Sequence, residues 1–220
     1  AALTGRRRQA AEVSCSLGSA AMLALTGIRV EVEGREHLQD HRPCVFMFNH
    51  QSHLDAYVLL TLLKGGVVGV SKIEMKRAPF LGSLMVAMEF VFLDRRDRRS
   101  AVETLRPVVA RIQSGRSLVI APEGTRSLTS RLGAFKKGGF HVALQAGVPI
   151  VPVVLCDTWE VVPRDSVMFR PGTVHVRVLP PIDVSGWSAE DLDARIAEVR
   201  QSYQRALDES ASRRAAPARP

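Results

Sequence analysis

The chain has 220 residues, of which 46% are hydrophobic and 24% are charged. This composition is that of a folded protein of about one domain, and it excludes an intrinsically disordered chain. The formal net charge of +8 at pH 7 indicates an anionic partner. Only 5% of the residues are aromatic and no nucleic-acid-binding motif is visible, so nucleic acid is not the expected partner.

The basic residues are unevenly divided, with 25 Arg and 5 Lys. The Arg guanidinium binds phosphate with two parallel hydrogen bonds, which the Lys ammonium cannot do. The excess of Arg therefore fits a phosphate ligand or an anionic lipid. A GC-rich genome would produce the same excess, and composition does not separate the two explanations.

The three cysteines, Cys15, Cys44 and Cys156, are far apart in the sequence. Their number is odd and no pair has the spacing of metal ligands, so neither a disulfide framework nor a zinc site is expected. This use of cysteine indicates a reducing compartment.

The N-terminal segment, residues 1–28, contains the longest mostly apolar stretch, residues 13–28, preceded by three arginines at 6–8. Ser and Gly interrupt the stretch, and it is shorter than the roughly 20 residues that span a bilayer. A signal peptide has a similar pattern, but the cysteine usage argues against export. We expect an amphipathic helix that lies on a membrane surface. The alternative is a helix packed on the protein core.

Beyond this segment, short apolar runs alternate with stretches of helical periodicity. In chain order, the pattern predicts strands at 29–33 and 44–48, a helix at 54–63, a strand at 67–70, a helix at 78–88, a strand at 91–93, a helix at 100–115, a strand at 118–120, a helix at 137–146, strands at 150–155 and 173–179, and a helix at 188–207.

This alternation is typical of an α/β fold with a mostly parallel central sheet flanked by helices. We expect one catalytic or binding domain at residues 29–209, because no repeat or internal boundary is visible. Residues 210–220 are expected to form a disordered tail.

The first candidate site is the sequence Asn-His-Gln-Ser-His-Leu-Asp at residues 49–55. His50 lies between a predicted buried strand and a helix, where sites in α/β sheets commonly occur. With His50 on the turn, the Asp55 carboxylate can reach its ring and stabilise the imidazolium that forms during proton transfer. A base without a nearby nucleophile favours direct attack by a substrate hydroxyl. Two alternatives remain open: a metal site that includes His53, and a purely structural turn.

The second candidate site is Pro-Glu-Gly-Thr-Arg-Ser at residues 122–127, after a predicted strand. Gly124 lets backbone N–H groups approach an anion, Thr125 offers a hydroxyl, and Arg126 offers a fork for phosphate. Glu123 can orient the guanidinium or accept a hydrogen bond from a glycerol hydroxyl. A capped loop with an internal Glu–Arg pair is the structural alternative.

Further cations lie at other predicted strand ends. Arg95 follows the strand at 91–93, where it could point into the same crevice as Arg126. Lys72 and Lys136 are weaker candidates, because an exposed Lys is usually only solvated.

These motifs resemble four sequence blocks of the glycerolipid acyltransferase family, whose best-known members acylate lysophosphatidic acid. Residues 49–55 look like the block in which His is followed five positions later by Asp. Residues 82–95 are similar to the block in which an Arg binds phosphate, and residues 122–127 to the Glu-Gly-Thr-Arg block. Residues 148–152 look like the fourth block, a hydrophobic strand. The resemblance covers roughly residues 29–179.

The resemblance implies that His50 takes the proton from the acceptor hydroxyl and that Asp55 holds His50. The hydroxyl oxygen then attacks the thioester of acyl-CoA or of an acyl carrier protein, without an acyl-enzyme, a metal or another cofactor. The residues implied in binding the phosphate and glycerol are Arg95, Glu123, Gly124, Thr125 and Arg126. Possible supporting residues are Asn49, Ser52, Lys72 and Lys136.

The expected reaction is acylation of 1-acylglycerol-3-phosphate to phosphatidic acid in phospholipid synthesis. The same chemistry on glycerol-3-phosphate, another lysophospholipid or a glycolipid is an alternative. A lipid-binding membrane protein without catalysis is a second alternative. The resemblance also implies peripheral or monotopic attachment to the cytoplasmic face of the cell membrane.

Overall fold

The computed structural model describes residues 2–78, 81–93, 101–127, 131–163, 166 and 168–215. Within these residues, seven strands form one sheet in the order β1-β7-β6-β2-β5-β3-β4. The strands are β1 (Ile28–Glu33), β2 (Val45–Phe48), β3 (Val67–Lys72), β4 (Val91–Leu93), β5 (Ser117–Ile120), β6 (Ile150–Leu155) and β7 (Gly172–Val178).

The sheet is largely parallel, as the sequence predicts. β6, β2, β5, β3 and β4 all pair in parallel, whereas β7 runs antiparallel to β6 and pairs in parallel with β1. The carboxyl ends of five strands therefore meet at one edge of the sheet, which is the edge where α/β proteins commonly build their sites.

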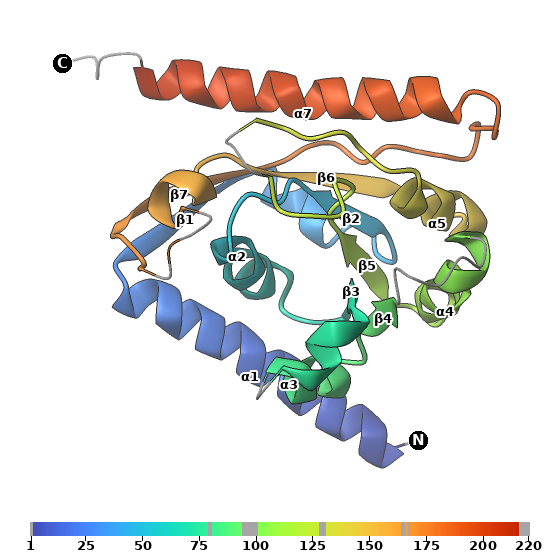
Figure 1. The fold of residues 1–220 in the computed structure, drawn as a ribbon, viewed down its shortest axis with the longest axis horizontal. Coiled ribbons are helices and arrows are strands. Elements are labelled where there is room, and N and C mark those ends of the chain that lie inside the picture. Colours follow the sequence, from blue (N-terminus) through green and yellow to red (C-terminus); the bar gives the residue numbers. More distant parts are fainter. Residues whose placement is uncertain are drawn as a thin grey trace.

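Helices cover both faces of this sheet (Figure 1). The α-helices are α1 (Ala2–Leu25), α2 (Leu54–Leu63), α3 (Leu81–Ala87), α4 (Ala101–Gln113), α5 (Gly138–Ala146), α6 (Thr158–Val161) and α7 (Leu192–Ala215), and the 3₁₀ helices are η1 (Arg35–Leu38) and η2 (Ile73–Arg77). The long helix α7 crosses one face, and α1 and α2 lie on the opposite face. This arrangement confirms the predicted α/β fold.

The apolar run at 44–48, which contains the central strand β2, has side chains in the core on both faces of the sheet. Val45 and Met47 belong to the core on the side of α4, α5 and α7, while Cys44 and Phe46 belong to the core on the side of α2. All four side chains are fully buried. A strand covered on both faces needs no polar alternation.

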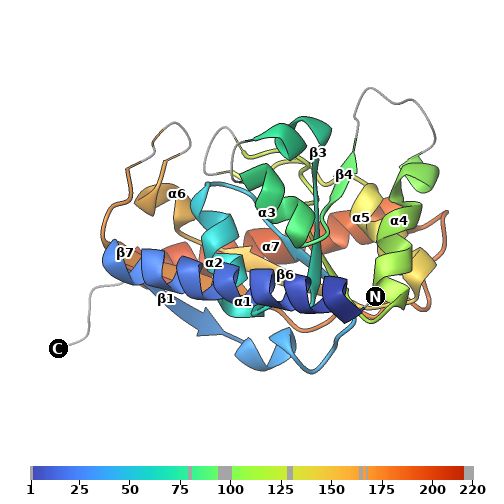
Figure 2. The same cartoon turned by 90° about the horizontal axis from the view of Figure 1, so that it is seen from below.

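Helix α1 packs on the core along one side and exposes apolar residues along another. It runs alongside α2 and the sheet (Figure 2), with Cys15 and Leu23 buried. Val13, Leu17 and Leu25 are exposed, Leu17 by 66% and Leu25 by 89%. Among the described residues, no helix is long and apolar enough to cross a membrane.

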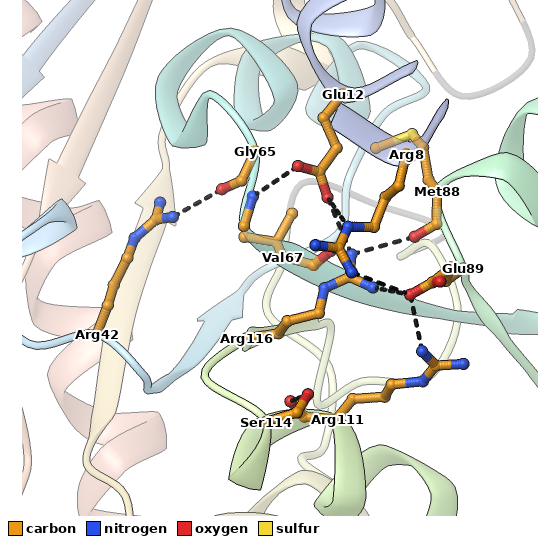
Figure 3. A network of polar contacts seen from close by, with 11 residues as sticks. Arg8, Glu12, Arg42, Gly65, Val67, Met88, Glu89, Arg111, Ser114 and Arg116 are labelled. Atoms are coloured by element: carbon orange, nitrogen blue, oxygen red, sulfur yellow. Dashed lines mark hydrogen bonds and ion pairs between the residues drawn. The ribbon is translucent and has the colours of Figure 1, made fainter. Parts of the chain in front are cut away.

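A buried ion network fixes α1 to the rest of the domain (Figure 3). Its centre is Arg116, immediately before β5, whose guanidinium contacts Glu12 of α1 at 3.1 Å and Glu89 after α3 at 2.8 Å. The same guanidinium donates to the carbonyl of Val67 in β3. Arg111 of α4 bonds Glu89 at 2.7 Å. One guanidinium thus links three elements that are distant in the sequence.

Helix α7 is longer at its carboxyl end than the sequence predicts. It begins at Leu192 and continues to Ala215, six residues into the segment expected to be disordered. Ser210 is buried, and Arg213 and Arg214 form ion pairs with Glu33 and Glu160, which stabilise the last turns. Residues 216–220 lie outside the described part of the chain.

Candidate active site

The loop after β2 is held at both sides of His50 by polar side chains. Asn49 continues the pairing of β2 with β6, because its amide donates to the Leu155 carbonyl and accepts from the Leu155 N–H, each at 2.8 Å. The Ser52 hydroxyl donates to the Val162 carbonyl at 2.6 Å. Both side chains are fully buried. The two residues expected to support the site therefore fix the backbone of the loop that carries His50.

His50 and Asp55 form the pair that the sequence predicts. Asp55 lies in the first turn of α2 and is fully buried, and its Oδ2 is 2.7 Å from Nδ1 of the His50 ring. The same oxygen accepts hydrogen bonds from the backbone N–H groups of Gln51 at 2.8 Å and Ser52 at 2.9 Å. The turn brings residues five apart into contact, which a continuous helix would not do.

This pairing fixes the chemistry available to His50. An Nδ1–H that donates to Asp55 leaves the Nε2 lone pair as the proton acceptor, and the carboxylate stabilises the imidazolium formed afterwards. The His50 side chain is 28% exposed, so a substrate can reach it from the edge of the sheet. The ring of Phe48 meets the His50 ring edge-on at 5.4 Å between centroids and limits its rotation.

The loop after β5 lies directly against the peptide of His50. The Glu123 carboxylate accepts the N–H of His50 at Oε1 and the N–H of Gly133 at Oε2, both at 2.8 Å. The side chain is almost fully buried, and burial raises the pKa of Glu123. This position differs from the contact with a glycerol hydroxyl or with Arg126 that the sequence suggests, because the carboxylate turns inward to two backbone amides.

The residues that follow Glu123 in this loop are less buried than Glu123 itself. Gly124 adopts a positive φ of 70°, which suits glycine in this tight turn. Thr125 is exposed and Arg126 is half-buried. Burial lowers the pKa of His53, and electrostatic interactions with Arg126 and His50 lower it further. Arg126 is therefore close enough to influence the loop that carries His50.

The other predicted cations differ in how close they lie to the loops of the candidate site. The Lys136 side chain lies against Gly124, since a Cβ added there would meet its Nζ at 2.9 Å. Lys72 ends β3 at the same sheet edge and is exposed. Arg95 lies outside the described residues, two positions after the end of β4. Within the described residues, His, Cys, Asp and Glu side chains form no group of three suited to a metal ion.

Two residues that support the loops of the site, Gly133 and Arg200, are not predicted from the sequence. Gly133 supplies the second amide to Glu123, and Arg200 of α7 holds the loop at 131–133 through the carbonyls of Leu132 and Gly133. No sequence motif signals either residue, because both act through backbone groups of a loop.

Comparison with known proteins shows the family to which the chain belongs. The family model described as Acyltransferase matches residues 29–156. A 1-acyl-sn-glycerol-3-phosphate acyltransferase of Limnanthes alba is 35% identical over 187 residues, which are 84% of this chain and 66% of the relative. The human 1-acyl-sn-glycerol-3-phosphate acyltransferase alpha is 35% identical over 179 residues, 81% of this chain and 63% of the relative. The chain thus spans just under two thirds of the length of these relatives.

A solved structure is similar as well. The crystal structure of the 1-acyl-sn-glycerophosphate (LPA) acyltransferase PlsC from Thermotoga maritima superimposes with a TM-score of 0.78 at 27% identity, covering 93% of this chain and 81% of that one. The sequence blocks, the sheet and these matches agree, and the chain belongs to the acyltransferase family that includes the 1-acylglycerol-3-phosphate acyltransferases.

Proposed function

We propose that this acyltransferase moves a fatty acyl group from acyl-CoA, or from an acyl carrier protein, to the free hydroxyl of 1-acylglycerol-3-phosphate and produces phosphatidic acid. The observation that carries the proposal is the His50–Asp55 pair, at 2.7 Å, beside a cation-bearing loop at the carboxyl edge of the sheet. The relatives described above carry the name of this activity, which supports the same acceptor.

The reaction follows from the tautomer of His50. Nε2 accepts the proton of the acceptor hydroxyl while the hydroxyl oxygen forms a bond to the thioester carbonyl carbon. The tetrahedral intermediate then breaks its C–S bond, and the thiolate leaves with the proton returned from His50. Throughout, Asp55 holds the ring and stabilises the transient imidazolium. The products are phosphatidic acid and the free thiol, and no covalent acyl-enzyme forms.

Positive charge near the pair suits a phosphate-bearing acceptor. Arg126 and Lys136 come from the loop after β5, and Lys72 ends a neighbouring strand. Arg95 is proposed as a further phosphate ligand on the basis of its sequence block. Such cations bind the phosphate of the acceptor and orient its hydroxyl toward His50. Thr125 and the backbone of Gly124 offer hydrogen bonds to the same group.

Helix α1 suits attachment to a membrane surface, where both lipid substrate and product reside. Its exposed apolar side chains Val13, Leu17 and Leu25 follow the exposed Arg6 and Arg7. Apolar area together with basic residues is the combination by which interfacial helices bind anionic bilayers. We assign the protein to the cytoplasmic face of the cell membrane, attached peripherally or monotopically.

The reaction and its acceptor can be tested with one panel. Radiolabelled acyl-CoA is supplied with 1-acylglycerol-3-phosphate, glycerol-3-phosphate, several lysophospholipids or a glycolipid in detergent micelles. Transfer to 1-acylglycerol-3-phosphate alone would support the proposal, whereas preference for another acceptor would reassign the substrate. If no acceptor is labelled, the panel is repeated with an acyl carrier protein donor. No transfer from either donor would favour the non-catalytic lipid-binding alternative.

A further inference from the structure

The Glu123 carboxylate accepts hydrogen bonds from main-chain N–H groups, although it lies within a few residues of the proposed phosphate ligands. Each oxygen accepts one main-chain N–H at 2.8 Å, from His50 on one side and from Gly133 on the other. The residue is only 5% exposed. A carboxylate in this position stabilises two loops with charge-assisted hydrogen bonds and has little surface left for a substrate.

The peptide groups of His50 are held from both sides by the loop after β5. The His50 N–H donates to Glu123, and the His50 carbonyl accepts the N–H of Ser127 at 2.8 Å. Asp55 independently holds the ring at Nδ1. The position of the base is therefore set by two separate carboxylates, one that orients the ring and one that fixes the main chain.

The contact between Glu123 and Gly133 connects Glu123 to the C-terminal helix α7. A Cβ at Gly133 would meet Oε2 of Glu123 at 2.8 Å, so any larger residue there would require the carboxylate to shift. On the other side of the same loop, Nε of Arg200 donates to the Gly133 carbonyl at 2.9 Å and Nη2 to the Leu132 carbonyl at 2.8 Å. Leu132 is buried in the core beneath α7. The loop at 131–133 thus bridges α7 and Glu123.

We propose that Glu123 is a positioning residue for the catalytic base, and that Arg200 of α7 supports it through Gly133. The inference rests on the proposed acyl transfer and assigns Glu123 to the placement of His50 instead of to the acceptor. Displacement of a reacting group by about 1 Å can lower a rate by about 10²-fold. Loss of this support therefore lowers kcat and leaves the affinity for the acceptor unchanged.

The test compares Glu123→Gln and Arg200→Met with wild type. Gln has the shape of Glu, but its NH₂ group cannot accept a hydrogen bond, so one of the two amides loses its partner. Arg205→Met is the matched control, because it removes an exposed arginine from the same helix. Steady-state rates are measured with acyl-CoA saturating and 1-acylglycerol-3-phosphate varied. Hydrogen exchange at the His50 amide is followed in the same preparations.

We expect Glu123→Gln to lower kcat by about tenfold or more and Arg200→Met by a smaller factor, each with the acceptor KM changed by less than about twofold. The His50 amide should exchange faster in both variants, and the control should match wild type. A higher acceptor KM with kcat and exchange preserved would overturn the proposal and make Glu123 a substrate ligand. If wild type transfers no acyl group, the proposed function fails, whereas unchanged exchange in Glu123→Gln would refute the positioning role independently.

Discussion

Asp55 holds His50 through a single carboxylate oxygen, Oδ2, which also accepts two backbone N–H groups of the intervening loop. The ring, the loop and the first turn of α2 therefore share one anionic centre. Because Asp55 is fully buried, this centre is shielded from water, and its electrostatic effect on the imidazole is stronger than at the surface. With Nδ1 of His50 bonded to Asp55, Nε2 of the same ring is the nitrogen that can accept a proton.

Replacement of Asp55 by Asn should remove most of the activity while keeping the fold. The Asn amide can donate to Nδ1 and so favours the tautomer that carries its proton on Nε2, where it cannot act as a base. We expect kcat to fall by roughly 10³- to 10⁴-fold, the scale of the same change in other His–Asp systems. Acyl-transfer rates measure the effect, with the exposed Asp40→Asn as control. A loss smaller than tenfold would contradict the role given to Asp55.

Replacement of Arg116 by Met should destabilise the domain strongly. The side chains of Arg116 and Glu12 are only 6% and 8% exposed, so the change removes the closer ion-pair partner of a buried carboxylate and leaves Glu12 with the longer contact to Arg8, at 3.8 Å (Figure 3). Removal of one member of such a pair costs about 3–5 kcal/mol of the free energy of unfolding. Urea denaturation measures this loss. The double variant with Glu12→Gln should recover part of the stability, and a change below about 1 kcal/mol would show that the network contributes little.

The buried Glu123 should make stability depend on pH in a definite direction. Burial raises its pKa above the value in the unfolded chain. The stability linked to this carboxyl group is fully present below its unfolded pKa and is lost as the pH rises through the raised folded pKa. The free energy of unfolding of wild type relative to Glu123→Gln should therefore decrease from acidic to neutral pH. Denaturation curves over this range test it, and an increase would mean that the folded pKa is depressed.

The exposed apolar side of α1 should contribute to binding of anionic vesicles. Leu17→Glu removes apolar area and adds a negative charge, each worth about 1 kcal/mol at a membrane surface, so binding should weaken by about tenfold or more. Gln201→Glu adds the same charge to an exposed position of α7, on the other face of the sheet, and serves as control. Sedimentation with phosphatidylglycerol-containing vesicles measures both. Equal binding by the two variants would exclude this side of α1 as the membrane contact.

Much of the fold could be predicted because the strands are short apolar runs separated by helical periodicity. The apolar run at 44–48, which contains β2, follows directly from residue types, and the spacing of His50 and Asp55 allows their contact once His50 lies on a turn. The reversal of β7 and β1 could not be predicted, since side-chain periodicity does not encode strand direction. The C-terminal extension of α7 depends on ion pairs of Arg213 and Arg214 with residues distant in the sequence.

The sequence indicates candidate site residues, but it does not specify what their side chains contact. Glu123 lies in a recognisable block, yet its partners are the amides of His50 and Gly133, and the motif does not specify where the carboxylate points. Arg200 lies on an ordinary amphipathic helix, and only the folded chain brings it to the loop at 131–133. Arg95 lies outside the described residues, and its role as a phosphate ligand stays a prediction.

The most direct test of the account is the rate of phosphatidic acid formation from acyl-CoA and 1-acylglycerol-3-phosphate by wild type and His50→Ala. The exposed His41→Ala, in the loop that precedes β2, is the matched control. We expect His50→Ala to lose turnover and to keep its fold and vesicle binding, while His41→Ala resembles wild type. Normal phosphatidic acid formation by His50→Ala would contradict the assignment of His50 as the base.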